Sequence, residues 1–318
     1  MLLKVLTTII LLIMTPIQAI QGVMLEYKAP EDPIEIFLFG DVMLGRYIAT
    51  LRAHSTEEDP TFPLTHLPEI IAAYTNDPEA IAINLEGPIT DFQISYCDLC
   101  FRFLPETAGL LANQGVTFAN LANNHIFNQG EEGLTQTKQY LEQAGINYAG
   151  QSESAVQEIN GLRVGWLGFN EVETYLDYEA ATAQTKELAD QTDFTIVAIH
   201  WGTEYVNTPS KAIQGHAHAF IDAGADIVWG THPHVIQSIE EYGSGVIFYS
   251  LGNMVFDQYW SAGTQEGLGV MLRITDELTY ELIPLKLTDW RGDPYLMTGD
   301  RKEDMLSRLE QYSNQIQQ

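Results

Sequence analysis

The sequence predicts an α/β fold in which mixed β-sheets pack as a sandwich flanked by helices. The first two thirds of the chain alternate short apolar runs with helical patterns, whereas the last third carries several strand-like runs in succession. Hydrophobic residues make up 45% of the 318 residues, which suffices for the core of one large domain.

The first half of the chain supplies three predicted strands and two predicted helices. Apolar runs at residues 34–40, 80–85 and 115–122 predict the strands. The helices are predicted over residues 44–54 and 131–144. Gly145 ends the second helix, because glycine readily adopts the left-handed conformation found at helix ends.

The second half continues this pattern and then turns to strands. Runs at residues 162–169, 193–199 and 225–230 predict strands, and a helix over residues 210–223 stops at Gly224. Hairpin-like strands follow at residues 235–240, 245–250, 268–275 and 279–287. The polar tail at residues 299–318 is expected to be helical.

The N-terminal segment indicates export. Residues 1–20 contain Lys4, an apolar run at residues 5–14, Pro16 and the small residue Ala19, which is the order found in secretory signal peptides. An uncleaved membrane anchor and a buried helix are the alternatives. Residues 21–33 form a linker and residues 34–298 one domain. The expected location is the cell envelope or the extracellular space.

Composition limits the partners. The chain has 43 acidic residues against 15 lysines and arginines, a formal charge of -28. Nucleic acid is therefore excluded as a partner, because phosphate binding requires a basic surface. The pair Cys97 and Cys100 fits a structural disulfide, two ordinary thiols, or a metal or redox site; export favours the disulfide.

Side chains able to bind metals follow the predicted strands at their carboxyl ends. The carboxyl ends of parallel strands meet at one edge of a sheet, so residues far apart in the sequence are expected to converge there. Carboxylate, amide and imidazole groups are ligands of Mn, Fe and Zn, and two such ions need a shared carboxylate. The converging residues are Asp41, Glu86, Asn123, Asn124, His125, His200, His232 and His234.

Each of these residues also has a structural interpretation. Asp41 suits a turn or a helix N-cap, Glu86 a surface turn and Asn124 a left-handed turn. His200 suits a core position. The pair His232 and His234 is the strongest signal, because Pro233 stiffens the backbone between the two imidazoles.

Further polar residues are candidates for substrate binding or for support of the ligands. Arg46 could hold a phosphate or carboxylate, with a surface ion pair as the alternative. Glu204 and Tyr205 are expected behind His200. Asn253 and Asp257 could close the site or simply form a turn.

Six sequence blocks between Ile34 and Gln258 resemble, in the expected order, those of the CapA/PgsA-like poly-γ-glutamate capsule biosynthesis proteins, which are grouped with the calcineurin-like metallophosphoesterases. The blocks are GDVMLGR, NLEGPIT, LANNHIFNQG, HWGTEY, GADIVWGTHPHV and YSLGNMVFDQ. The resemblance implies a metallophosphoesterase-like fold and a pair of divalent metal ions.

The same resemblance implies a role for each residue. His125 would face the leaving group and protonate it, Glu86 would bridge the two metals, and Asn123 would hold the turn. The implied metal ligands are Asp41, Glu86, Asn124, His200, His232 and His234.

Three positions depart from the family or superfamily pattern. Asn128 stands where family members often carry Asp, Ile126 where wider phosphoesterases have an acid, and Met43 where many of them have a metal-binding His. These departures favour a non-catalytic role, whereas the nearly complete ligand set favours catalysis.

Three hypotheses follow. The first is an exported protein that serves synthesis, release or export of poly-γ-glutamate, an anionic polymer, within a membrane polymer-synthesis complex. The second is a metal-dependent phosphoesterase with another substrate, and the third is a non-catalytic assembly factor. Because a charge of -28 repels a polyanion at long range, binding would rest on the metals and on Arg46. The chain has neither a Walker-type phosphate loop nor a nucleophile elbow.

Overall fold

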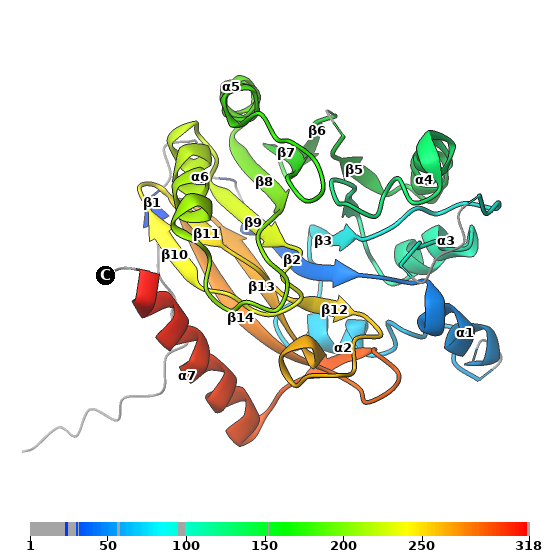
Figure 1. Cartoon of the computed structure of the whole chain (residues 1–318). Coiled ribbons are helices and arrows are strands. Elements are labelled where there is room, and N and C mark those ends of the chain that lie inside the picture. The colour runs from blue at the N-terminus through cyan, green and yellow to red at the C-terminus, as the bar shows by residue number, and fades with distance from the viewer. Residues whose placement is uncertain are drawn as a thin grey trace, which may run out of the picture.

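The computed structural model describes residues 23–24, 30, 32–55, 58–94, 99–151 and 153–316 (Figure 1). It confirms the predicted fold class: two mixed β-sheets pack against each other and helices flank them. The predicted signal or anchor at residues 1–20 lies outside the described residues. Within the part of the chain that is described, no helix is both long and apolar enough to cross a bilayer.

The first sheet has nine strands among the described residues. Its main path runs β1-β14-β13-β2-β3-β4-β5, with β12 beside β2 and β15 beside β14. The strands β2, β3, β4 and β5 are parallel, so their carboxyl ends share one edge. The bounds are β1 Val23–Met24, β2 Ile34–Val42, β3 Ala80–Leu85, β4 Phe118–Asn120, β5 Asn147–Ala149, β12 Asn253–Val255, β13 Glu266–Ile274, β14 Glu277–Leu287 and β15 Pro294–Leu296.

The second sheet follows the order β10-β11-β9-β8-β7-β6. Its central strands β7, β8, β9 and β11 are parallel, while β6 and β10 are antiparallel edges. The bounds are β6 Ala155–Ile159, β7 Leu162–Asn170, β8 Phe194–His200, β9 Ile227–Thr231, β10 Ile239–Tyr242 and β11 Gly245–Phe248.

Helices cover the outer faces of both sheets (Figure 1). The first sheet packs against α1, α2, α3 and α4, and the second against α5 and α6. The bounds are α1 Arg46–Ser55, α2 Leu67–Ala72, α3 Glu106–Asn113, α4 Gly130–Ala144, α5 Tyr178–Ala189, α6 Lys211–Asp222, η1 Gly263–Gln265 and α7 Gly299–Ile316.

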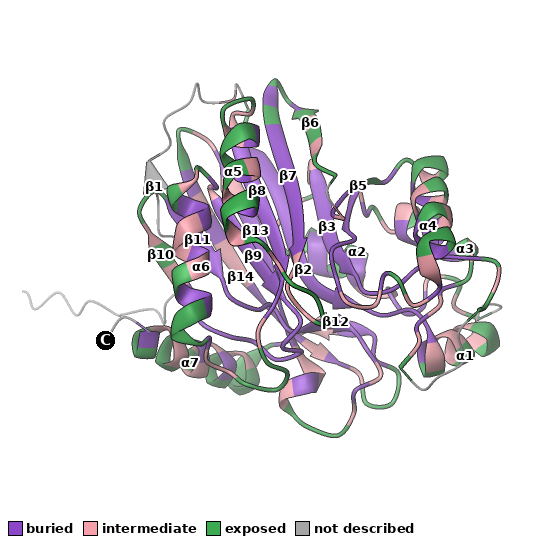
Figure 2. Cartoon of the chain, turned by 45° about the horizontal axis from the view of Figure 1, so that its top comes forward, coloured by how far each residue is buried: buried purple, intermediate pink, exposed green. Residues whose placement is uncertain are grey.

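Alternation along the strands creates the layers. In β2, Ile36 and Leu38 face the core between the sheets, whereas Phe37 and Phe39 face the helices. Phe118 of the first sheet stacks on Trp166 of the second, with ring centroids 4.0 Å apart. Figure 2 shows the resulting pattern: the strands are mainly buried, and the helices expose their outer sides.

Most predicted elements are present, but one predicted strand is largely absent, and several helices and short strands were not predicted. The helix α4 ends at Gly145, which has a φ of 74°, as predicted. The prediction of a strand over residues 235–240 is largely wrong, because β10 begins only at Ile239. The helices α2, α3 and α5 were not predicted. The sequence signal of α5 is weak because two of its three buried residues are Ala181 and Thr185.

Two further features are the packing of the C-terminal helix α7 and the disulfide bond of Cys100. The side chains of Met305 and Leu309 in α7 enter the core between the sheets. Cys100 is disulfide-bonded, while Cys97 lies outside the described residues.

Candidate metal centre

The side chains that follow the strands come together where the carboxyl ends of the two sheets meet. The first sheet contributes Asp41, inside β2 near its end, and Glu86, directly after β3. The second sheet contributes His200, the last residue of β8, and His234, which follows β9. His234 Nδ1 lies 3.2 Å from Asp41 Oδ2, and its Nε2 lies 3.7 Å from Glu86 Oε1.

Two further predicted residues, Asn124 and His125, enter from the loop after β4. Asn124 Oδ1 lies 3.0 Å from His200 Nε2, and His125 Nε2 lies 3.9 Å from Glu86 Oε1. The prediction placed the carboxylates, the amide and the imidazoles at one edge, and the described structure brings them into contact there.

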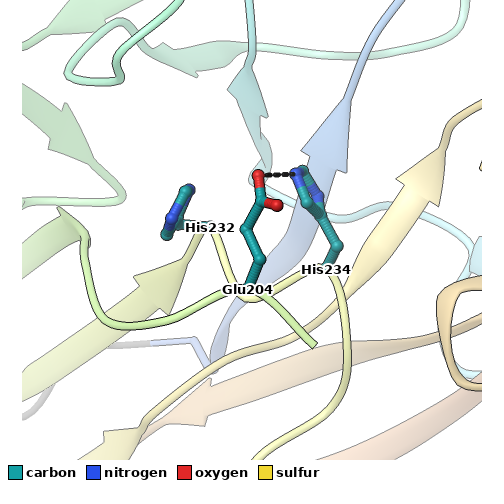
Figure 3. A group of neighbouring side chains, drawn as sticks. All are labelled: Glu204, His232 and His234. Carbon is teal, nitrogen blue, oxygen red and sulfur yellow. Dashed lines mark ion pairs between the residues drawn. The ribbon is translucent and has the colours of Figure 1, made fainter. Parts of the chain in front are cut away.

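The potential ligand atoms form two groups. Asp41, Glu86 and His200, all buried, make the first. The second contains Glu204, His232 and His234 (Figure 3). Within each group the atoms lie within 4.8 Å of one another, which suits a shared ion. Glu204 therefore lies against the histidines after β9, as a candidate ligand as well as a supporting residue.

Buried atoms without partners test whether a cation fits. Within the described part of the chain, neither carboxylate oxygen of Glu86 has a hydrogen-bond partner, and the same holds for His232 Nδ1. Such an orphaned polar atom costs about 1–3 kcal/mol. A divalent ion between the two groups would satisfy these atoms, and carboxylate with imidazole is a donor set suited to Mn, Fe or Zn. The residues at this centre therefore fit a pair of divalent metal ions.

Burial sets the charge states of the histidines. It lowers the pKa of His125 and of His232 to about 4, and His234 adds to both shifts by repulsion. It also lowers the pKa of His200 well below the ordinary value. At neutral pH these imidazoles are neutral, which is the form that binds metals. By contrast, burial and then the nearby Asp41 carboxylate raise the pKa of Glu86.

Two buried asparagines inside the strands support the ligands. Asn84 Nδ2 donates to Asp41 Oδ1 at 2.8 Å, and Asn120 Nδ2 donates to Asn84 Oδ1 at 2.8 Å. Neither residue was predicted from the sequence. A polar residue within the apolar runs of β3 and β4 was the available signal, because burying an amide requires a partner.

The orientation of His125 depends on Asn128. The backbone N–H of Phe101 donates to Asn128 Oδ1 at 2.7 Å, which identifies that atom as the amide oxygen. His125 Nδ1, 3.0 Å from the same oxygen, must therefore donate to it. The Nε2 lone pair then points toward Glu86. Asn128 thus orients the imidazole through an uncharged acceptor.

The other two residues that depart from the superfamily pattern lie in the hydrophobic core. Met43 and Ile126 are both fully buried in the core between the first sheet and its helices. The backbone N–H of Gly45 donates to Met43 Sδ at 3.2 Å. No imidazole stands where Met43 does, so the first group relies on Asp41, Glu86 and His200.

The remaining predicted residues line or support the site. Asn123 connects two loops by donating to the Leu85 carbonyl at 2.9 Å and accepting the His125 N–H at 3.2 Å. Asn253 Oδ1 lies 2.9 Å from His234 Nδ1. Arg46 forms a bidentate ion pair with Asp257, so its guanidinium is neutralised beside the centre.

Backbone strain gathers at this centre. Eight of the described non-glycine residues have left-handed φ angles, and four of them lie at this centre: Arg46 at 48°, Tyr205 at 64°, His232 at 97° and His234 at 56°. Each such residue costs about 1–3 kcal/mol and persists where the surrounding structure enforces it, often at functional sites. The strain therefore includes two of the candidate ligands, His232 and His234.

Fold and site together define an α/β protein of two packed sheets with a buried carboxylate and histidine centre. The family model described as "Bacterial capsule synthesis protein PGA_cap" matches residues 35–258, and the chain belongs to this family.

Relatives cover most of the chain. It is 29% identical to the capsule biosynthesis protein CapA of Bacillus anthracis, over 93% of this chain and 78% of that protein. It is also 29% identical to the PGA biosynthesis protein CapA of Bacillus subtilis, over 89% and 80% respectively. A solved structure, a hypothetical protein from Thermus thermophilus, matches with a TM-score of 0.50 at 15% identity, over 79% of this chain and 99% of that one, and shows the fold alone.

Proposed function

We propose that this protein serves the synthesis or export of poly-γ-glutamate at the cell envelope through a two-metal hydrolytic centre at the joint edge of its sheets. Family membership supports the role in capsule synthesis, and the similarity to a PGA biosynthesis protein supports the polymer. The signal-like segment at residues 1–20 supports export, and a membrane polymer-synthesis complex is the proposed partner.

The observation that carries the hydrolytic centre is the state of Glu86. This carboxylate is fully buried, and among the described residues neither of its oxygens has a hydrogen-bond partner. Imidazole nitrogens of His125 and His234 lie 3.9 and 3.7 Å from Oε1. A buried carboxylate placed between two imidazoles suits two cations better than any role in the core.

The proposed chemistry follows from the ligand set. Two bound divalent ions would supply Lewis-acid stabilisation and a water whose pKa is lowered toward neutrality. Asp41, Glu86 and His200 would hold one ion, and His232, His234 and Glu204 the other. Asn124 would contribute its amide oxygen to the first group.

His125 is the proposed proton-transfer residue. Asn128 fixes its tautomer, which leaves Nε2 as a proton acceptor in the free site. To protonate a leaving oxygen, His125 must first gain a proton, and an anionic substrate bound next to it would favour that protonated form.

Metal content tests the proposal. Residues 21–318, purified without chelator, are expected to hold about two metal ions per chain by elemental analysis. His234→Ala should reduce this content. His54→Ala is the matched control, because His54 is exposed on α1 and its Nδ1 bonds the Thr50 carbonyl of the same helix. The control should keep the full content.

A substrate screen with γ-glutamyl and phosphoester compounds then separates the hypotheses. Turnover of poly-γ-glutamate that is lost in His234→Ala supports the proposal, whereas turnover of phosphoesters alone would favour another substrate. Metal without turnover would favour an assembly factor. No uptake of Mn, Fe or Zn would overturn the metal centre.

A further inference from the structure

We propose that five aromatic side chains beside the metal centre form a platform that binds the uncharged backbone of the polymer. We call Tyr205, Trp260, Tyr259, Tyr47 and Trp290 the aromatic platform. This inference rests on the proposed function for the identity of the polymer, but the platform and the metal centre are separate structures that can be tested separately.

Four of the five rings are unusually exposed, and the partly buried Tyr259 lies among them. Trp290 is 68% exposed, Trp260 63%, Tyr47 45% and Tyr205 44%. Most soluble proteins bury large aromatic side chains, and exposed aromatic clusters mark binding sites. The described residues contain six exposed aromatic side chains, and these four are most of them.

The rings contact one another in two groups. Tyr205 meets Trp260 edge to face, with centroids 6.0 Å apart. Tyr259 meets Tyr47 at 6.3 Å and Trp290 at 5.4 Å. Tyr259 and Trp260 are neighbours in the sequence, so the backbone connects the two groups of rings. A ligand that contacts both groups must be longer than one monomer.

Hydrogen bonds and ring contacts attach the platform to the metal centre. The ring of Tyr205 stacks near His234, with centroids 6.2 Å apart and an interplanar angle of 30°. Gln258 Nε2 donates to the Tyr205 hydroxyl at 3.4 Å, and Asn253 Nδ2 donates to Gln258 Oε1 at 3.1 Å. A chain lying on the platform therefore reaches the centre at its Tyr205 end.

The second attachment is at Arg46. The residue after it, Tyr47, donates its N–H to Asp257 Oδ2 at 3.3 Å, and Asp257 also pairs with Arg46. The guanidinium lies 5.1 Å from the centroid of the Phe101 ring. The platform thus ends beside a cation that can exchange a carboxylate of the protein for one of the ligand.

The charge of the protein selects the mode of binding. A chain of net charge -28 repels a polyanion, so a surface of many cations is not available for it. Aromatic faces carry no net charge and pack against methylene and amide groups. Each γ-linked glutamate offers two methylenes and an amide in its backbone, and its carboxylate can stay in water. The platform fits this backbone.

Binding of poly-γ-glutamate oligomers of increasing length tests the proposal. Residues 21–318 are titrated with each oligomer while tryptophan fluorescence and heat are recorded. We expect the affinity of the wild type to rise with the length of the oligomer. Trp260→Ala and Trp290→Ala should each lower the affinity for the longer oligomers by about tenfold. Tyr175→Ala is the matched control, because Tyr175 is 88% exposed and lies outside the platform. Metal content should stay unchanged in all three variants.

The outcomes separate this inference from the proposed function. Equal affinities in the wild type and both tryptophan variants would overturn the platform, even with two metals bound. Tryptophan-dependent binding of a neutral glycan in place of the polymer would also overturn it. Length-dependent polymer binding by a protein that takes up no metal would support the platform and overturn the proposed hydrolytic centre.

Discussion

His234 Nδ1 lies 3.2 Å from Asp41 Oδ2, so an imidazole that follows β9 of the second sheet meets a carboxylate in β2 of the first. The hydrophobic core between the sheets holds these two residues together, since neither strand pairs with the other. The candidate metal centre is therefore a product of sheet packing, and its integrity should follow that of the packing.

Glu86→Gln should separate stability from metal binding. Burial and the Asp41 carboxylate raise the pKa of Glu86, so at pH 7 folding requires this carboxyl to take up a proton or to hold a disfavoured charge, whereas an amide is always neutral. We therefore expect the metal-free variant to be more stable than the wild type by about 1–3 kcal/mol at pH 7. The same change should reduce the stabilisation that added Mn or Zn provides. Urea unfolding after chelation, and again after metal is restored, measures both effects. A metal-free variant that is less stable would contradict our account of Glu86.

Gly40→Ala should disturb the position of Asp41. A Cβ atom on Gly40 would lie 1.9 Å from the carbonyl oxygen of Gly252, which accepts the Asp41 N–H at 2.9 Å. We expect a loss of about 1–3 kcal/mol in unfolding free energy, together with lower metal content.

Gly109→Ala is the matched control for that substitution. Gly109 lies inside α3, and a Cβ there meets no atom within 4 Å. This change should stabilise the protein by about 0.5–1 kcal/mol and leave the metal content unchanged. Equal effects of the two substitutions in urea unfolding would refute the role of the close approach at Gly40.

Asn128→Ala should destabilise the protein, because the Phe101 N–H and His125 Nδ1 both donate to the Asn128 side chain. Leaving the buried Phe101 N–H without an acceptor costs about 1–3 kcal/mol. Asn128→Asp keeps the acceptor and should retain most of the stability. Thermal unfolding of the metal-free proteins compares the two variants, and a loss of similar size in both would show that the acceptor is not what matters.

Asp226→Asn should change the pH dependence of stability. Burial raises the pKa of Asp226 to about 7, while its oxygen accepts the Thr195 N–H at 2.7 Å. In the unfolded chain this pKa is about 3.9. The folded protein thus binds more protons between these values, and the contribution of Asp226 to stability falls as pH rises from about 4 to about 7.

The variant carries no such titration, because the asparagine amide stays neutral. Its stability relative to the wild type should therefore increase from pH 5 to pH 8. The increase should be about 1–2 kcal/mol, reduced from the full shift because solvent reaches part of the side chain. Urea unfolding midpoints across this range give the difference, and parallel curves for the two proteins would show that Asp226 titrates normally.

Much of the architecture was available from the sequence. Continuous apolar runs predicted β2, β3, β7, β8 and β9, because a strand that is buried on both faces is apolar along nearly its whole length. Carboxylates, amides and histidines at the ends of these strands predicted where the candidate ligands lie, since parallel strands share an edge.

Other features could not be predicted from any single stretch of the sequence. The sequence did not reveal that Asn84 and Asn120 stand behind Asp41, or that α5 covers the second sheet. It placed Glu204 behind His200, whereas the structure groups it with His232 and His234. Nor did it connect Tyr47, Trp260 and Trp290, which come from three separate segments.

The sequence by itself thus determined most of the central strands and which chemical groups stand at their ends, because apolar runs and residue types are local properties of the chain. Only the tertiary structure decided which of those groups meet. His234 contacts Asp41 because two sheets pack face to face through Trp166, Phe118 and their neighbours. Such contacts between distant segments depend on the packing of the whole core, which no single segment encodes.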